Sequence, residues 1–368
     1  MEVERYIETR VPKATIPPMS ADPIYLDHAA TAPLLPEARA AMERGFEIWA
    51  NPSSPHRAGR AARAALEEAR ERVKAALGWA GEVVFTSGAS EALAIAIARC
   101  VRPLAAVSAV EHDAVLRLVG DAPRIAVNRA GQVGPDRADA GGLVAVQHVN
   151  SETGVIQMVE AWTDAAQAAG GALLCDCAQS AGKLLLPKAD LIALSAHKFG
   201  GPIGIGALLV RDWALLRPSG GQERGYRPGT ENLPGALAMA AALEMGPEWT
   251  KEAARLRLLL ESAIECEGGE VIAREAARIA TIGAYRMPGV PSAVQLIRLD
   301  AMGIAVSAGS ACSSGSLKPS HVLAAMGMAE KPASEVIRVS IGRDTTEADI
   351  RRFIAGWSEI AATARAAA

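Results

Sequence analysis

The sequence predicts an α/β protein whose large domain has a mostly parallel sheet wrapped by helices, followed by a smaller α+β domain. Apolar runs of strand length alternate with longer segments rich in Ala, Leu, Glu and Arg, and this texture changes after about residue 240. Strands that alternate with helices at this spacing are typical of parallel sheets. The apolar runs are nearly unbroken, which indicates strands that are buried on both faces.

The expected elements follow from these patterns in chain order. In the large domain, helices are expected over residues 36–49, 59–77, 91–99 and 163–169, and strands over 82–87, 104–110, 124–128, 142–149, 171–178, 191–196 and 205–210. A helical pattern over 238–265 then leads into two strand-like stretches at 277–285 and 292–300. After a Ser/Gly-rich loop come a helix at 320–327, a strand at 335–342 and a closing helix from Thr346.

The chain is long enough to form more than one domain. Its 368 residues exceed the size at which a single core stops growing. We expect an N-terminal leader over 1–23, a large domain over 24–240 and a small domain over 241–368.

Composition excludes several classes of function. The net charge is −3 and charges of both signs are mixed along the chain, so neither nucleic acid nor a membrane surface is an expected partner. No apolar run reaches the roughly 18 residues of a membrane span, and the acidic start without an apolar stretch is unlike a signal peptide.

The cysteines point to a reducing compartment, for which we expect the cytoplasm. They are odd in number in a long chain, which argues against a disulfide framework. Cys175 and Cys177 have no second pair at metal-ligand spacing, so no metal site is expected. Packing is the expected role of Cys100, Cys175, Cys177 and Cys266.

A strand that turns into a helix at residues 85–91 could hold a phosphate. Gly88, Ala89 and Ser90 are small and let the backbone approach a ligand, and the first amides of a helix attract anions. The alternative is an ordinary helix start capped by Ser87 or Ser90, and for this segment taken alone the alternative is favoured.

Two further strand ends carry polar side chains. Asp176 ends a buried strand, with Gln179 just beyond it, and a carboxylate there needs a cationic partner, such as a protonated pyridine nitrogen. A helix cap or structural ion pair explains Asp176 equally well in isolation. Lys198 follows the apolar run 191–196 and precedes a glycine turn, which suits an amine that forms a Schiff base better than a solvated loop lysine.

Several longer motifs occur in a fixed order along the chain. They are YLDHAAT at 25–31, NPSSPH at 51–56, TSGASE at 86–91, EH at 111–112, HVNSETG at 148–154, DCAQ at 176–179, SAHK at 195–198, GGQERGYRPGTEN at 220–232 and SAGSACSSG at 307–315. On these motifs the chain resembles the class V aminotransferase group of fold-type I pyridoxal-phosphate enzymes. Within that group it resembles the cysteine desulfurases that feed iron–sulfur cluster assembly. It departs from the usual pattern at Ala32 and Ser151, which affects substrate contacts.

The resemblance implies a cofactor, pyridoxal 5'-phosphate, and a role for individual residues. Lys198 would form the Schiff base, and His112 would stack on the ring and move protons. Asp176 would pair with the pyridinium nitrogen and Gln179 with the phenolic oxygen. The residues implied to hold phosphate are Gly88, Ala89, Ser90, Ser195 and His197.

The same resemblance implies a shared site and a carboxylate clamp. Thr230 would reach the phosphate in the neighbouring subunit, which implies a homodimer. Asn51, Asn150 and Arg338 would bind the carboxylate of the substrate, and the planar guanidinium of Arg338 suits that task.

Cys312 lies in a small, polar, glycine-containing segment, SAGSACSSGSLKPS, which predicts an exposed loop. The resemblance makes it the catalytic cysteine of the long-loop branch. L-cysteine would become L-alanine, with its sulfur carried as a persulfide on Cys312 to an acceptor protein such as an iron–sulfur scaffold. Only a thiolate attacks sulfur, and His112 is the expected acceptor of the thiol proton.

Three other interpretations are open. A selenocysteine lyase, or another class V lyase or aminotransferase, would use the same cofactor, but an aminotransferase has no use for Cys312. A non-catalytic interaction protein would have no need of Lys198, Asp176, His112 and Cys312 together. A dinucleotide-dependent dehydrogenase is disfavoured, because no Gly-x-Gly-x-x-Gly follows the first strand.

Overall fold

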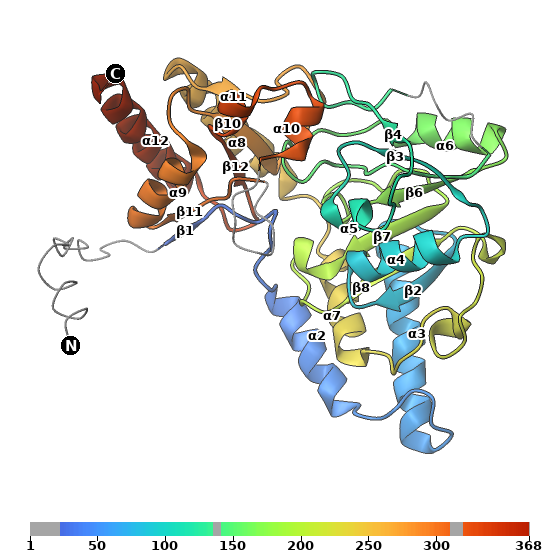
Figure 1. The fold of residues 1–368 in the computed structure, drawn as a ribbon. Helices are drawn as coiled ribbons and strands as arrows, with labels where there is room; N and C mark the ends of the chain where they lie inside the picture. Colours follow the sequence, from blue (N-terminus) through green and yellow to red (C-terminus); the bar gives the residue numbers. More distant parts are fainter. Residues whose placement is uncertain (1–22, 135–140, 310–318, 368) are drawn as a thin grey trace, which may run out of the picture.

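The computed structural model describes residues 23–134, 141–309 and 319–367, and Figure 1 shows their arrangement. A seven-stranded sheet forms the centre, in the order β2-β8-β7-β6-β5-β3-β4. Only β8 runs antiparallel to its neighbours, β2 and β7. The bounds are β2 (Glu82–Thr86), β3 (Leu104–Ser108), β4 (Arg124–Ile125), β5 (Leu143–Ala145), β6 (Ala172–Asp176), β7 (Leu191–Ser195) and β8 (Gly206–Val210). The predicted α/β class with a mostly parallel sheet is confirmed.

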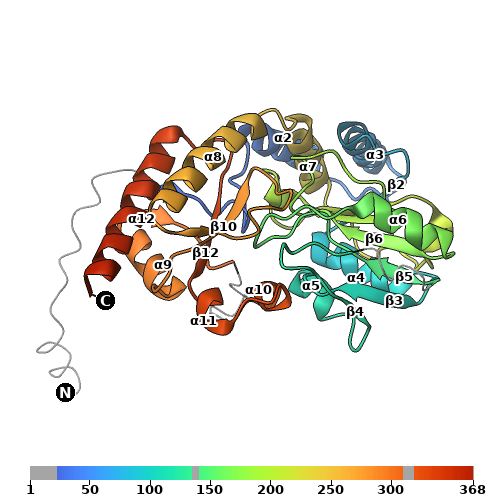
Figure 2. The ribbon, with the colours of Figure 1, turned by 90° about the horizontal axis from the view of Figure 1, so that it is seen from above.

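Helices cover both faces of this sheet, with α6 and α7 on one side and α4 and α5 on the other (Figure 2). Their bounds, with those of two outer helices, are α2 (Pro36–Glu47), α3 (Arg57–Leu77), α4 (Ala89–Arg99), α5 (Asp113–Leu116), α6 (Val159–Ala168) and α7 (Leu233–Glu244). Successive strand residues alternate between the two faces. Leu173 and Cys175 therefore pack on the side of Trp162 in α6, whereas Leu174 packs on the side of Leu93 in α4.

The single helix expected over 238–265 is two helices. α7 is followed by α8 (Thr250–Cys266) after a break at Gly246, which has a φ of 64°, and Pro247. A left-handed glycine ends a helix, and proline lacks the amide that would continue it. α7 is buried on nearly all sides, because α2 and α3 pack against its outer surface.

The small domain contains an antiparallel sheet in the order β12-β10-β9. Its elements are β9 (Glu270–Val271), β10 (Ile282–Arg286), α9 (Ser292–Ala301), β11 (Ile304–Ala305), α10 (His321–Ala325), α11 (Glu330–Ala333), β12 (Val336–Ser340) and α12 (Glu347–Ala367). The stretch 292–300, expected as a strand, is a helix. Ser292, Gln295 and Leu299 are its buried residues, a spacing of three to four that belongs to one helix face.

The first described strand packs on the small domain. β1 (Ile24–Tyr25) pairs in parallel with β11, and Ile24 and Leu26 belong to the small-domain core. The first described residues, expected within the domain 24–240, thus contact the small-domain core. The expectation for the cysteines was wrong at Cys266, which is exposed, whereas Cys100, Cys175 and Cys177 are buried.

No helix in the described ranges is long and apolar enough to cross a membrane.

Candidate active site

A cavity of about 770 Å³ opens at the carboxyl ends of β6 and β7. Parallel sheets bind ligands at this edge, and the volume is within the range of small-molecule sites. The opposite wall comes from the small domain. The sequence-predicted residues that line the cavity are Gly88, Ala89, Ser90, His112, Asp176, Gln179, Ser195, His197, Lys198 and Arg338.

The start of α4 forms one wall. Gly88 is its N-cap and receives no side-chain cap, so neither Ser87 nor Ser90 plays the capping role considered above. A Cβ on Gly206 would lie 2.6 Å from the Cα of Gly88, and one on Gly88 would lie 3.4 Å from the Ser195 hydroxyl oxygen. Glycine at both positions thus lets β8 and α4 approach closely. The uncapped amides beside a serine hydroxyl are a suitable cradle for a phosphate.

Lys198 lies in a short 3-10 helix (Ala196–Lys198) that directly follows β7. Its Nζ donates to the carbonyl oxygens of Ala29 and Ala30, both at 2.7 Å. Burial and the nearby Arg338 lower the pKa of Lys198 to about 8. A large neutral fraction of this amine is therefore present near pH 8, which is what nucleophilic or basic lysines require.

Asp176 points a buried carboxylate into the same cavity. Its Oδ1 accepts from the Ala178 amide at 2.8 Å, and burial raises its pKa while that bond and the charges of His112 and Lys198 oppose the rise. Among the described residues it forms no salt bridge within 4.0 Å, which removes the structural ion pair as an explanation. The carboxylate can therefore receive a cationic ligand atom.

Gln179 and His112 line the same cavity. Gln179 donates Nε2 to the Ala29 carbonyl at 2.9 Å, while its buried Oε1 lacks a partner in the described structure. His112 caps α5, with Nδ1 accepting from the Ala114 amide at 3.1 Å, and burial lowers its pKa. A neutral ring with Nδ1 as acceptor carries its proton on Nε2. That Nε2 proton is available for donation into the cavity. The expectation that His112 accepts the thiol proton of Cys312 stays a prediction, because Cys312 lies outside the described residues.

Arg338 extends from β12 into the cavity. Its Nη2 donates to Asp27 Oδ1 at 2.7 Å and its Nη1 to the Ser151 carbonyl at 3.0 Å, while Nε is buried without a partner among the described residues. The guanidinium is thus held rigidly, with donors at the cavity surface. This arrangement suits a carboxylate ligand, which would share the guanidinium with Asp27.

Three predicted substrate or phosphate residues are absent from the cavity lining. Asn150 is buried and structural, because its Oδ1 accepts from the Glu152 and Thr153 amides at 3.0 and 2.9 Å. Asn51 is exposed and accepts from the Ser53 amide at 2.8 Å, in the α2–α3 loop at the far end of those helices from the sheet (Figure 1). Thr230 is exposed as well.

Thr230 follows a loop that two ion pairs hold in place, one to α4 and one to α3. Arg227 bonds Glu91 of α4 at 2.9 Å, and Glu223 bonds Arg70 at 2.8 Å, with both side chains 1% exposed. Glu223 also accepts from the amide of a β2 residue. The position of Thr230 is therefore set by the strand and helix that form the cradle.

Cys312 lies outside the described residues. Gly309 and Pro319, which border the segment 310–318, both line the cavity. Glu152 lies beside Gly309, and its Oε2 accepts from the Ser320 hydroxyl at 2.6 Å.

Sequence reasoning gave no role to several other polar residues of this cavity, among them Asp27, Glu111, Glu152 and His321. The first three lie within the motifs quoted above, so a signal was present, although nothing local indicated their partners. Glu111 is fully buried and accepts from the Gln147 amide at 2.7 Å. Burial raises its pKa well above the usual range. His321 contacts the Glu111 carbonyl at 2.9 Å and had no motif to indicate it.

Comparison with known proteins gives consistent results. The model of the class-V aminotransferase family matches residues 24–353. A cysteine desulfurase of Rhodobacter capsulatus is 36% identical over 380 residues, covering 94% of this chain and 98% of the relative. A solved NifS-like protein from Rickettsia africae has a TM-score of 0.84 and 26% identity, covering 92% of this chain and 99% of that one.

A second solved structure, described as SspA in complex with cysteine, has a TM-score of 0.75 and 28% identity, covering 88% of this chain and 100% of that one. Family model, relatives and fold agree over nearly the whole length of the chain. The chain belongs to the class-V aminotransferase family and, within it, to the cysteine desulfurases.

Proposed function

We propose that this cavity binds pyridoxal 5'-phosphate and converts L-cysteine to L-alanine, with the sulfur transferred to Cys312 as a persulfide. The observation that carries the proposal is the meeting of three groups in one cavity. These are the Lys198 amine, the unpaired Asp176 carboxylate and the uncapped amides of α4. An amine for the aldehyde, a carboxylate for the ring nitrogen and amides for the phosphate match the three polar parts of the cofactor.

The other lining residues complete the fit. Ser90, Ser195 and His197 border the phosphate end, and burial together with the charges of Lys198 and Lys183 lowers the pKa of His197 to about 4, so that it is neutral. Gln179 Nε2 carries a second hydrogen besides the one it donates to the Ala29 carbonyl, and this hydrogen could bond the phenolic oxygen. When bound, the cofactor supplies an electron sink for the charge left after loss of the substrate α-proton.

The residues of the chain would supply binding and proton transfer. Arg338 holds the substrate carboxylate through its fixed guanidinium, and Lys198, with a pKa of about 8, accepts the α-proton at Nζ. His112 carries a proton on Nε2 that it can donate. The Cys312 thiolate then bonds the substrate sulfur while the Cβ–S bond breaks, its electron pair staying on carbon as alanine forms.

We further propose a homodimer in which Thr230 and Asn51 complete the cavity of the partner subunit. Both are exposed and lie outside the cavity of their own subunit, while Ile203, at its rim, is an apolar residue that is 79% exposed. In the proposed dimer the partner subunit would cover Ile203. The sulfur acceptor would be a protein such as an iron–sulfur scaffold. A cytoplasmic location fits the described cysteines, which are all free.

The decisive experiment supplies L-cysteine and a reductant and measures alanine and sulfide together, with intact mass recorded before reduction. Equal amounts of the two products and one added sulfur at Cys312 are expected. Cys312→Ala should keep the cofactor and bind cysteine but form neither product at the wild-type rate. Cys266→Ala, which removes an exposed thiol elsewhere in the chain, is the matched control and should behave as wild type. Persulfide and alanine at the wild-type rate from Cys312→Ala would refute the assignment, and pyruvate or transamination products would indicate another class V reaction.

A further inference from the structure

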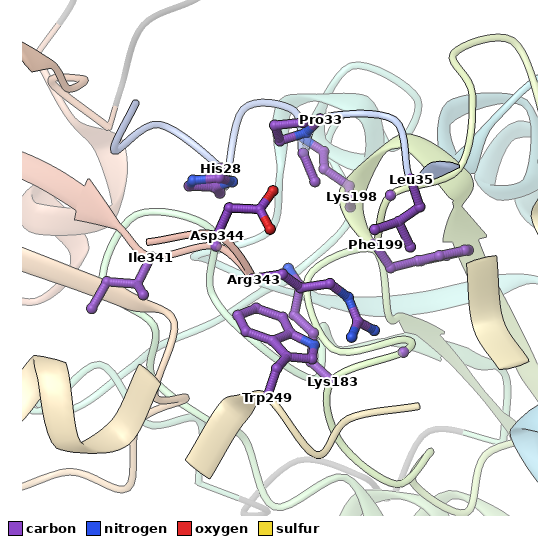
Figure 3. A pocket seen from close by; sticks show the side chains of 14 residues that line it. His28, Pro33, Leu35, Lys183, Lys198, Phe199, Trp249, Ile341, Arg343 and Asp344 are labelled. Carbon is purple, nitrogen blue, oxygen red and sulfur yellow. The ribbon is translucent and has the colours of Figure 1, made fainter. Parts of the chain in front are cut away.

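A second, smaller cavity lies behind Lys198, between the two domains. Its volume is about 30 Å³, room for one or two particles the size of a water molecule. The large domain contributes Lys183, Lys198 and Phe199, and the small domain contributes Trp249 and the segment 341–344. Figure 3 shows these side chains around the cavity, with the charged groups of Lys183, Arg343 and Asp344 on its walls.

Lys183 is the unexplained group in this cavity. It is 5% exposed, and among the described residues its amine forms no hydrogen bond or ion pair, in contrast to Lys188, which pairs with Asp164 at 3.2 Å. A buried ammonium without a counter-charge is costly, so it must lose its proton or gain an anion. His28, on the same wall, also has a buried Nδ1 without a partner in the described structure.

The charges of the lining leave one positive charge unmatched. Arg343 and Asp344 are neighbours of opposite sign, and Arg343 is otherwise engaged with the Gly246 carbonyl and the Trp249 ring. His28 is neutral near pH 7, because burial lowers its pKa to about 4. Lys198 bonds two carbonyl oxygens. In the proposed function its amine is bonded to the cofactor. A protonated Lys183 therefore requires a single negative charge.

We propose that this cavity is a binding site for one small monovalent inorganic anion, such as a halide, held by the Lys183 ammonium. The small volume excludes phosphate esters and carboxylate metabolites, and the single excess charge selects a monovalent ion. The site is separate from the substrate cavity, although the Lys198 side chain lines both. An anion here joins walls from both domains and stabilises the arrangement in which they meet.

Binding should depend on pH, because only the ammonium attracts an anion. In the empty cavity burial lowers the pKa of Lys183 to about 7, with Lys198 and Arg338 adding repulsion. The other charged groups facing this region are His197, Asp27, Glu37, Arg343 and Asp344. Above pH 7 the half-saturating anion concentration should rise about tenfold per pH unit, since proton and anion bind together.

The test uses the cofactor-loaded protein and sodium chloride, with sodium gluconate as the bulky control salt at equal ionic strength. Chloride should raise Tm saturably, and gluconate should not. Lys183→Met should abolish the difference, Asp344→Asn should strengthen it by removing a repelling charge, and Lys188→Met should leave it intact. Crystals grown in bromide should show one anomalous peak beside Lys183.

Equal Tm values in chloride and gluconate would overturn the proposal, as would a chloride effect that survives in Lys183→Met. If that variant does not fold, Lys183→Gln and the bromide crystal of the wild type decide. A bromide crystal with no peak in the cavity refutes the site, and a peak that Lys183→Gln removes supports it.

Discussion

Replacement of Arg338 by alanine tests the substrate clamp most directly. The guanidinium bonds Asp27 at 2.7 Å and the Ser151 carbonyl at 3.0 Å, and its side chain is only 7% exposed. It reaches the cavity from the small domain, whereas the cradle at the start of α4 belongs to the large domain. Arg338→Ala should therefore weaken cysteine binding and leave cofactor occupancy unchanged.

The magnitude follows from the bonds that a substrate carboxylate would lose. A hydrogen bond to a charged group contributes about 1.5–3 kcal/mol, which corresponds to a fall in kcat/KM of roughly 10- to 150-fold. The Asp27 carboxylate, left without its cation, would also repel the substrate. Arg338→Ala combined with Asp27→Asn should consequently have a higher kcat/KM than Arg338→Ala alone.

The assay is steady-state alanine production, with cofactor absorbance recorded on the same samples. Arg286→Ala is the control, because Arg286 lies on the neighbouring strand β10 and pairs with Glu270 at 2.6 Å and Glu335 at 2.7 Å, outside the cavity lining. It should lower stability without changing KM. A kcat/KM for Arg338→Ala within about twofold of wild type, or a parallel loss of cofactor, would refute the clamp.

Three further predictions concern single side chains. Lys198→Ala should lose the covalently attached cofactor and alanine production, measured by absorbance and product assay; normal turnover would exclude it as the catalytic amine. In halide-free buffer, the pKa of Lys183 is about 7 in the folded state, below its ordinary value near 10.5. The unfolded chain therefore binds more protons from pH 7 to about 10, and stability should rise there by up to ~1.4 kcal/mol per pH unit. Urea unfolding of Lys183→Met should show a correspondingly flatter profile, and identical profiles would contradict this. Glu223→Gln should cost about 3–5 kcal/mol of unfolding free energy, because it removes the buried counter-charge of Arg70 and leaves only the partly exposed Glu67. Glu244→Gln, at a surface ion pair, should cost under ~1 kcal/mol, and equal costs by urea titration would show that burial is not the cause.

The large-domain fold was predictable because its signal is local and repeated. Each buried strand is an apolar run, and residues such as Leu173 and Leu174 must be apolar because they face opposite cores. The strand prediction for residues 292–300 was wrong because apolar residues there are not all buried. The apolar residues Val294 and Ile297 of this stretch are 41% and 71% exposed on α9. Sequence alone does not reveal which apolar residues remain exposed.

The site was predictable where a motif ends a strand, and not where partners come from distant parts of the chain. Asp176 and Lys198 each follow an apolar run, so their place at the sheet edge could be foreseen. The pairing of Asp27 with Arg338 joins residues 311 positions apart in the chain. Lys183 gave no signal, because its lack of a partner within the part of the chain that the structure describes is a property of the folded molecule alone.

The segment 24–31 explains how two domains can share one site. Its β1 strand pairs with β11 of the small domain, and Asp27 holds Arg338. Its next carbonyls, at Ala29 and Ala30, accept from Lys198 of the large domain. One short backbone stretch therefore fixes both the carboxylate clamp and the amine. A shift of the small domain relative to the sheet would move Arg338 together with the carbonyls that hold Lys198, so the spacing between clamp and amine depends on this segment. The backbone of the motif YLDHAAT must therefore keep one position relative to both domains. It connects them at the cavity, where their side chains act on the same ligand.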